Sequence, residues 1–438
     1  MMTDNGTATA VMSADGSVAN HAPNKRPKKA RQFICRGTPL FTRTCLALIC
    51  SGFSAFAALY GLLSALPTVA HDFDLSASKT SLVMSFPTLT LAIGLIFTGP
   101  LSDALGRKPV LVGSMLAAGG VTVLTALTTD WKSFLVMRGI LGLVLGGLTA
   151  INMTYLTEEI EPDELGFAVG LVIGGNSLGA MMSRLMVGVM AEYGLWRETV
   201  AGLGLLTVVG AILIRFKLPA SRNFAARSLS FTNAAAGYAM HFSDPVLRSL
   251  FVTGFLIMGS FVAFWNFISF HLMREPMHFS QAAVGYLSLL NIVSTITSTK
   301  VGGLTQRFGS AKVLIASLCI AILGVALCLS LSITLVILGI TLFMCGFFAA
   351  HSAASGWIGR SAKRARAQAT SLYQIFFYSG ASAASIGGGY LWARADWLGV
   401  SLMITALLGI SLLLVLRKEY RQMRPTKTVK VLSPSNTA

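Results

Sequence analysis

Two ionisable side chains lie deep inside long apolar stretches of the sequence: Arg138 in the stretch 133–155 and His351 in the stretch 333–357. Charged groups are costly at membrane depth and mark functional sites there, and histidine changes its charge near neutral pH. We therefore expect Arg138 to bind a ligand and His351 to exchange protons. The structural alternatives are an arginine held by backbone carbonyls and a histidine that packs through a hydrogen bond. A further arginine, Arg184, is expected to extend toward the outer surface of the membrane that the chain spans.

Carboxylates are missing from the interior of these stretches, because all 17 Asp and Glu residues lie in tails, loops or helix ends. A membrane site for cations commonly needs a buried acid, so this pattern favours a neutral or anionic ligand. The cysteines have no CxxC spacing and no phosphate-binding loop is present, so we expect no metal and no cofactor. Polar and aromatic residues expected at the ligand are Tyr60, Asn152, Asn266 and Tyr378. Such side chains also join membrane helices to one another.

Long apolar stretches must position these residues. The chain is 54% hydrophobic and only 12% charged, whereas soluble domains carry about 25% charged residues. A membrane crossing needs about 20 apolar residues. The sequence therefore predicts an all-α polytopic membrane protein with twelve crossings. The predicted crossings are 44–70, 80–101, 109–129, 133–155, 165–190, 197–216, 248–272, 281–301, 311–330, 333–357, 367–391 and 397–416.

The distribution of positive charge predicts the orientation. If both termini are cytoplasmic, the inside segments hold 27 Lys and Arg residues and the outside segments hold five. Positive charge concentrates on the cytoplasmic side of membrane proteins, so we expect a multi-pass membrane protein with both termini inside. The basic cluster before residue 44 is interpreted as this orientation signal rather than as a nucleic-acid site. The expected surroundings are the lipid bilayer.

An internal repeat divides the chain. Gly99-Pro-Leu-Ser-Asp-Ala-Leu-Gly-Arg-Lys108 and Gly302-Gly-Leu-Thr-Gln-Arg-Phe-Gly309 share the pattern G-x-L-[ST]-x-x-x-G at a spacing of 203 residues. Both follow the second predicted crossing of a half, which indicates two duplicated, pseudo-symmetric six-helix bundles. The predicted domains are a disordered and then basic tail 1–43, an N-terminal bundle 44–216, a linker 217–247, a C-terminal bundle 248–416 and a tail 417–438. The linker is predicted to hold either an interfacial helix or no regular structure.

The segment 99–108 resembles the loop signature G-x-L-x-D-x-x-G-R-K of the major facilitator superfamily. The segments FICRGTPLF at 33–41 and HSAASGWIG at 351–359 resemble its bacterial inner-membrane branch of sugar and drug efflux permeases, which implies a bacterial inner membrane as the location. The resemblance implies alternating access between two bundles around a central substrate site. It makes Arg138 the signature arginine of its helix. It also implies a cytoplasmic gate, to which we assign Gly99, Asp103, Gly106, Arg107, Lys108, Glu158 and Glu159. Gln306 replaces the acid of the second copy, and 175–180 lacks the Gly-Pro pair usual in drug/proton antiporters.

The expected function is proton-coupled efflux of a small neutral or anionic compound by a functional monomer. A uniporter or exchanger without proton coupling and an uptake permease are the alternatives within transport. A membrane-embedded enzyme would need a catalytic group at membrane depth, and one histidine without an acid is insufficient. A membrane sensor would need a soluble output domain, which neither tail offers.

Overall fold

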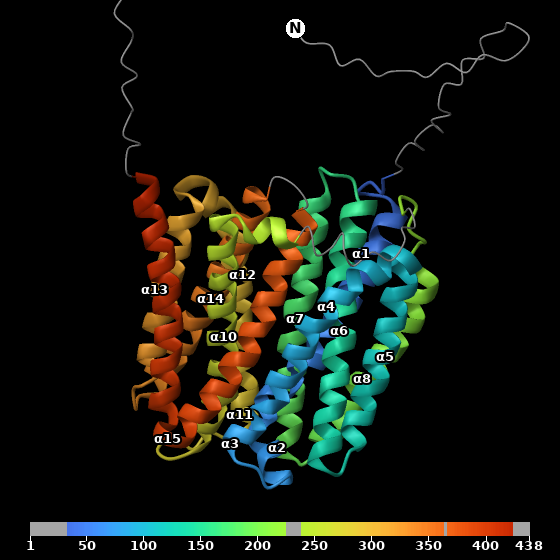
Figure 1. The fold of residues 1–438 in the computed structure, drawn as a ribbon. Coiled ribbons are helices and arrows are strands. Elements are labelled where there is room, and N and C mark those ends of the chain that lie inside the picture. Colours follow the sequence, from blue (N-terminus) through green and yellow to red (C-terminus); the bar gives the residue numbers. More distant parts are fainter. Residues whose placement is uncertain (1–32, 225–237, 363–365, 424–438) are drawn as a thin grey trace, which may run out of the picture. The chain divides into compact units, whose positions relative to one another are not determined.

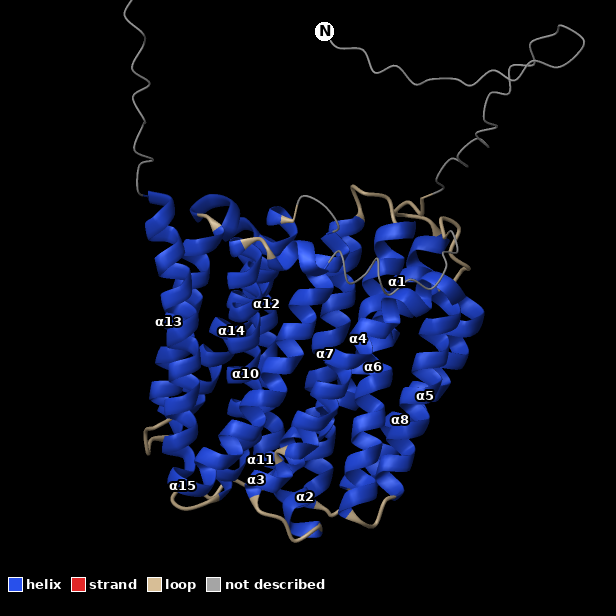
Figure 2. Ribbon diagram, in the orientation of Figure 1, coloured by secondary structure: helices blue, strands red, loops and turns tan. Residues whose placement is uncertain are grey.

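The computed structural model describes residues 33–224, 238–362 and 366–423. Predictions for the first 32 residues, for the centre of the linker and for the end of the C-terminal tail lie outside these ranges. Within them the regular structure is helical, apart from one isolated parallel bridge between Ile34 and Ile160 (Figure 2).

The N-terminal half forms six crossings. In chain order its elements are α1 (Pro39–Tyr60), η1 (Gly61–Ala65) and α2 (Leu66–Asp72); α3 (Ala77–Thr80) and α4 (Leu82–Leu105); α5 (Arg107–Leu127); α6 (Trp131–Glu159); α7 (Leu165–Glu192); and α8 (Trp196–Lys217). The first crossing changes from α-helix to a 3₁₀ turn at Gly61, and 3₁₀ stretches inside a helix often mark hinges.

The C-terminal half repeats this arrangement. Its elements are α10 (Pro245–Met273); α11 (Gln281–Tyr286), η2 (Leu287–Leu290) and α12 (Asn291–Phe308); α13 (Ser310–Leu327); α14 (Ile333–Ser361); and α15 (Arg366–Met423). The long α15 contains two crossings, because Ala395 and Asp396 break the helical backbone inside it.

In the described residues, hydropathy identifies fewer membrane spans than the helices form crossings, and there are two reasons for the difference. Length and composition alone identify ten candidate spans, one of which is the double crossing Gln368–Arg417. The crossing made by α11, η2 and α12 is not among them, because its apolar helical stretch Gln281–Val293 is by itself shorter than a membrane span. Counting both corrections gives the twelve crossings that the sequence predicts.

Capping residues explain where several helices begin. The Thr38 hydroxyl accepts a hydrogen bond from the Phe41 amide, and the Asp130 carboxylate accepts one from the Ser133 amide. Such caps satisfy amides that have no partner inside the helix. The Ser133 amide lowers the pKa of the Asp130 carboxyl below its ordinary value, because the hydrogen bond stabilises the charged form.

The internal repeat is visible in the backbone. Gly106 (φ 96°, ψ 155°) and Gly309 (φ 86°, ψ 151°) each separate two helices at a turn of the same conformation. This positive φ is open to glycine and strained for other residues. The fold therefore preserves the turn of the signature loop in both halves, although the acid is present in only one of them.

The two halves meet along helices that are far apart in sequence (Figure 1). α4 packs against α15, and α7 packs against α11. We call the end of the bundle that holds α2, α3 and α11 the outer end, which the charge distribution predicts to be periplasmic; it lies at the bottom of Figure 1.

Contacts across the two halves concentrate near the outer end. Thr68 in α2 donates a hydrogen bond of 3.1 Å to Gln281 in α11, and the Glu192 carboxylate accepts one of 2.9 Å from the Ala282 amide. At Gly188 of α7 a Cβ atom would lie 2.7 Å from the Cα atom of Gly285 in α11. Backbone therefore touches backbone at this crossing of the two halves.

Candidate functional site

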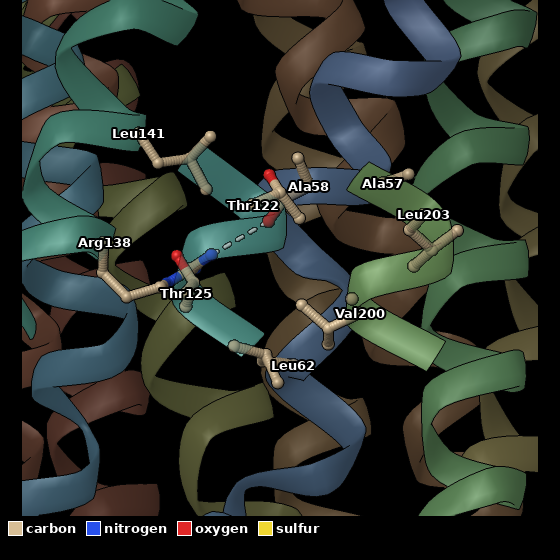
Figure 3. Close-up of a pocket in the computed structure, with 10 residues that line it drawn as sticks. Ala57, Ala58, Leu62, Thr122, Thr125, Arg138, Leu141, Val200 and Leu203 are labelled. Carbon is tan, nitrogen blue, oxygen red and sulfur yellow. Dashed lines mark hydrogen bonds between the residues drawn. The ribbon is translucent and has the colours of Figure 1, made fainter. Parts of the chain in front are cut away.

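Arg138 is buried in the N-terminal half, with 1% of its surface exposed. Its guanidinium donates to the carbonyl oxygens of Ala58 and Leu59, each at 2.9 Å, and to that of Val83 at 3.2 Å (Figure 3 shows the bond to Ala58). Each acceptor lies where the α-helical hydrogen-bond pattern is interrupted. Ala58 and Leu59 lie among the last four carbonyls of α1, and the residue four positions after Val83 is Pro87, which has no amide hydrogen.

The cavity beside Arg138 is small and lies wholly within the N-terminal half (Figure 3). Its volume is about 10 Å³, which corresponds to roughly one water molecule. Its lining comes from α1, η1, α5, α6 and α8. The contacts of Arg138 are those of the structural alternative, and its role at a ligand stays a prediction.

Arg184 does not extend to the outer surface, and that expectation was wrong. Only 2% of the residue is exposed, and its guanidinium carbon lies 4.9 Å from the ring centroid of Trp265 in α10. Arg184 precedes the end of α7 by eight residues, and Trp265 precedes the end of α10 by eight residues. At a rise of 1.5 Å per residue, both lie about 12 Å from the outer helix ends. The side chain therefore points between the two halves rather than out of the membrane.

Two of the predicted ligand residues lie near this arginine. Tyr60, at the end of α1, is within electrostatic range of the Arg184 guanidinium and of the Tyr378 hydroxyl in α15. Tyr60 and Tyr378 are 5% and 3% exposed. The structure thus gathers aromatic and cationic groups from both halves at one place. Sequence reasoning proposed the two tyrosines but missed the arginine and the tryptophan.

Asn266 belongs to a chain of hydrogen bonds across the halves. Its side-chain amide donates to the Ser385 hydroxyl at 2.6 Å, and Ser385 donates to the Ser81 carbonyl at 2.9 Å. The amide oxygen of Asn266 is buried without a hydrogen-bond partner, and so is that of Asn152, which is 3% exposed on α6. Asn266 therefore joins helices, while both amide oxygens remain able to accept a hydrogen bond.

His351 lies among aromatic rings of the C-terminal half. Its Nδ1 atom is 2.9 Å from the Tyr373 hydroxyl, and its ring lies 4.5 Å from that of Phe377 and stacks on Phe347 at 6.2 Å. A neutral imidazole can donate or accept in the bond to Tyr373. This geometry fits both a packing histidine and a proton acceptor.

The signature loop forms a charge cluster at the cytoplasmic corner of the N-terminal half. Arg107 contacts Asp103 at 2.6 Å and binds Glu158 through two bonds of 2.7 and 3.0 Å. It also donates to Ser102 at 2.6 Å. One guanidinium thus joins the ends of α4, α5 and α6. Lys108 donates instead to the Leu218 carbonyl at 2.5 Å. Gly106 forms the turn between α4 and α5, whereas Gly99 lies inside α4.

Glu159 lies apart from this cluster, although we expected it to join the charges of Asp103 and Arg107. Its side chain is buried and accepts hydrogen bonds from the Ser221 hydroxyl at 2.5 Å and the Asn223 amide at 2.9 Å. Successive residues on a helix point about 100° apart, so Glu158 and Glu159 cannot both face Arg107. Glu159 instead holds the start of the linker against α6.

Several known proteins are similar to this chain in sequence. The Major Facilitator Superfamily model matches residues 48–350 and 250–435. The inner membrane transport protein YnfM of Escherichia coli (strain K12) is 42% identical over 407 residues, covering 93% of this chain and 98% of that protein. The uncharacterized MFS-type transporter YybF of Bacillus subtilis (strain 168) is 37% identical over 380 residues, covering 87% and 94%.

Structural similarity agrees with the sequence matches. A solved structure of the xylose transporter XylE from E. coli, in a partially occluded inward open conformation, has a TM-score of 0.69 and 13% identity, covering 87% of this chain and 98% of that chain. At this identity the likeness concerns the fold. With the family match it makes the chain a secondary transporter of the inner membrane with a small-molecule substrate, rather than an enzyme. The chain belongs to the major facilitator superfamily.

Proposed function

We propose that this transporter exports a small neutral or anionic compound by alternating access, with one central site exposed to each side in turn. The observation that carries the proposal is the meeting of the two halves at Arg184 and Trp265. Tyr60 of the first half interacts electrostatically with Arg184 and with Tyr378 of the second half. A site shared by two bodies is rebuilt when one body rocks against the other, as in secondary transporters.

The moving units in this proposal are the bundles 44–216 and 248–416, joined by the linker 217–247, within a monomer. The contacts at Thr68, Glu192 and Gly188 hold the halves together near the outer end. These contacts would have to open for the site to face the outside. The cluster at Arg107 lies at the opposite end, and we assign to it the control of the cytoplasmic gate.

A transport measurement tests the proposal directly. The purified chain in proteoliposomes, with a pH-sensitive dye in the lumen, is challenged with sugars, organic anions and cationic drugs. We expect a proton flux with a neutral or anionic compound and none with cationic drugs, because all 17 Asp and Glu residues lie in tails, loops or helix ends rather than at membrane depth. Empty liposomes are the control. A flux triggered only by cationic drugs would contradict the proposal.

The same assay separates the alternatives. Movement of labelled substrate without any proton flux would indicate a uniporter or an exchanger. The direction in which a proton gradient drives the substrate distinguishes export from uptake.

Proton coupling is assigned to His351, whose Nδ1 atom faces the Tyr373 hydroxyl. We expect His351→Gln to abolish the substrate-triggered proton flux while leaving exchange of labelled substrate across the membrane. Glutamine retains a hydrogen-bonding side chain but cannot carry a proton at neutral pH. The matched control is His278→Gln, which removes a histidine from the outer loop after α10. A wild-type proton flux in His351→Gln would make the histidine a packing residue.

A further inference from the structure

The guanidinium of Arg184 is buried without a counter-ion. No ion pair of this side chain occurs among the described residues, and one terminal nitrogen, Nη1, has no hydrogen-bond partner there. Its Nε atom donates to the Ala180 carbonyl of its own helix at 2.8 Å. A buried charge with unused donors is costly, and the stacking on Trp265 recovers only part of that cost.

The contrast with Arg138 shows what is unusual. Arg138 is equally buried, but each of its three guanidinium nitrogens donates to a backbone carbonyl. Those bonds join three helices of one half. Arg184 faces the other half, and the fold supplies no comparable acceptors. The hydrogen-bonding capacity of Arg138 is thus used within its own bundle, whereas that of Arg184 is only partly used.

The surroundings of Arg184 match a small organic anion. An arginine fork binds a carboxylate through two parallel hydrogen bonds, and an anion would supply both the missing acceptor and the missing countercharge. The aromatic neighbours of Arg184, Trp265 and Tyr60, are nearly fully buried, at 1% and 5% exposure, so the guanidinium lies in an apolar environment. Near them, the 3₁₀ turn at Gly61–Ala65 carries Ser64, whose hydroxyl donates to the Arg184 carbonyl at 2.5 Å.

We propose that Arg184, stacked on Trp265 at the junction of the two halves, binds the carboxylate of the transported compound, which makes the substrate an organic carboxylate. The inference rests on the proposed function and narrows its substrate class from neutral or anionic to carboxylate. Because the guanidinium and the indole come from different halves, binding of the carboxylate also depends on how far apart the halves are.

Binding is tested on the purified full chain in detergent, without a membrane or a gradient. The probe is sodium benzoate, and benzamide is its uncharged counterpart of the same shape. We expect benzoate to raise the Tm of the wild type in a concentration-dependent way, because a ligand of the folded state stabilises it. Benzamide should leave the Tm unchanged. No shift with benzoate, or an equal shift with benzamide, would overturn the carboxylate site.

Variants locate the site. Arg184→Gln should weaken benzoate binding at least about tenfold, since a charge-assisted hydrogen-bonded pair is lost. Arg394→Gln is the matched control, because Arg394 also stacks on an aromatic ring, that of Tyr390 at 4.0 Å, but is exposed. It should bind benzoate as the wild type does. Wild-type binding in Arg184→Gln would overturn the assignment.

The Tm of Arg184→Gln without ligand gives a second readout that needs no probe. An arginine kept for function should be removable without loss of stability, because its burial is unfavourable. We therefore expect the Tm of the variant to equal or exceed that of the wild type. A clear fall in Tm would make the residue structural. The binding readout is separate from transport, so carboxylate binding without transport would contradict the proposed function and leave this site standing.

Discussion

Arg138→Ala should lower the free energy of unfolding by roughly 3 kcal/mol, because three buried backbone carbonyls lose their donor at once. The carbonyls of Ala58 and Leu59 at the end of α1, and that of Val83 ahead of Pro87, lie where the α-helical hydrogen-bond pattern is interrupted. The measurement is unfolding of the purified variant in detergent, followed by intrinsic fluorescence. Arg394→Ala, at an exposed arginine, is the control and should stay within experimental error of the wild type.

The alternative outcome is informative. If Arg138→Ala unfolds like the wild type but no longer moves an anionic substrate, the residue belongs to the ligand site that the sequence predicts. Arg138→Lys should retain part of the stability, since an ammonium has three donors but not the planar fork of the guanidinium.

Asp103→Asn should reduce transport at least about tenfold while leaving folded protein in the membrane. Arg107 binds Asp103 and Glu158 together, so neutralising one acid removes half of the charge that orients the guanidinium. Asp103 is 38% exposed in its side chain, and partly exposed ion pairs contribute about 1 kcal/mol or less to stability. The effect should therefore appear in transport rates rather than in the Tm.

The control for this variant is Asp163→Asn, which removes an exposed carboxylate from the loop between α6 and α7 at the same end of the bundle. It should transport like the wild type. Rates at the wild-type level in Asp103→Asn would show that the cluster has no part in gating.

Most of the fold follows from the sequence because membrane crossings are encoded redundantly. Apolar length, charge asymmetry and the repeat around Gly106 and Gly309 each predict the same arrangement. For the crossing 281–301 two of these signals agree: the stretch is apolar, and the second copy of the motif follows it 203 residues after the first copy.

The site was harder to predict, because it depends on where the side chains point rather than on which amino acids are present. In the sequence, Arg184 resembles an arginine near a helix end. Only the packing of α7 against the other half directs its side chain toward Trp265. Depth was an available signal, since a residue eight positions from a helix end lies about 12 Å inside. Glu158 and Glu159 show the same limit, because adjacent residues on one helix serve different neighbours.

The contact between Gly188 and Gly285 offers a way to set the resting state of the transporter. A methyl group at position 188 would lie 2.7 Å from the Cα atom of Gly285 in the other half when the outer end is closed, and separation of the halves removes that contact. Its approach to the Ser64 hydroxyl at 3.0 Å lies within one half and does not depend on their separation. A substituent that is unfavourable in only one state displaces the equilibrium toward the other. Gly188→Ala would then act as a wedge that enriches outward-open molecules.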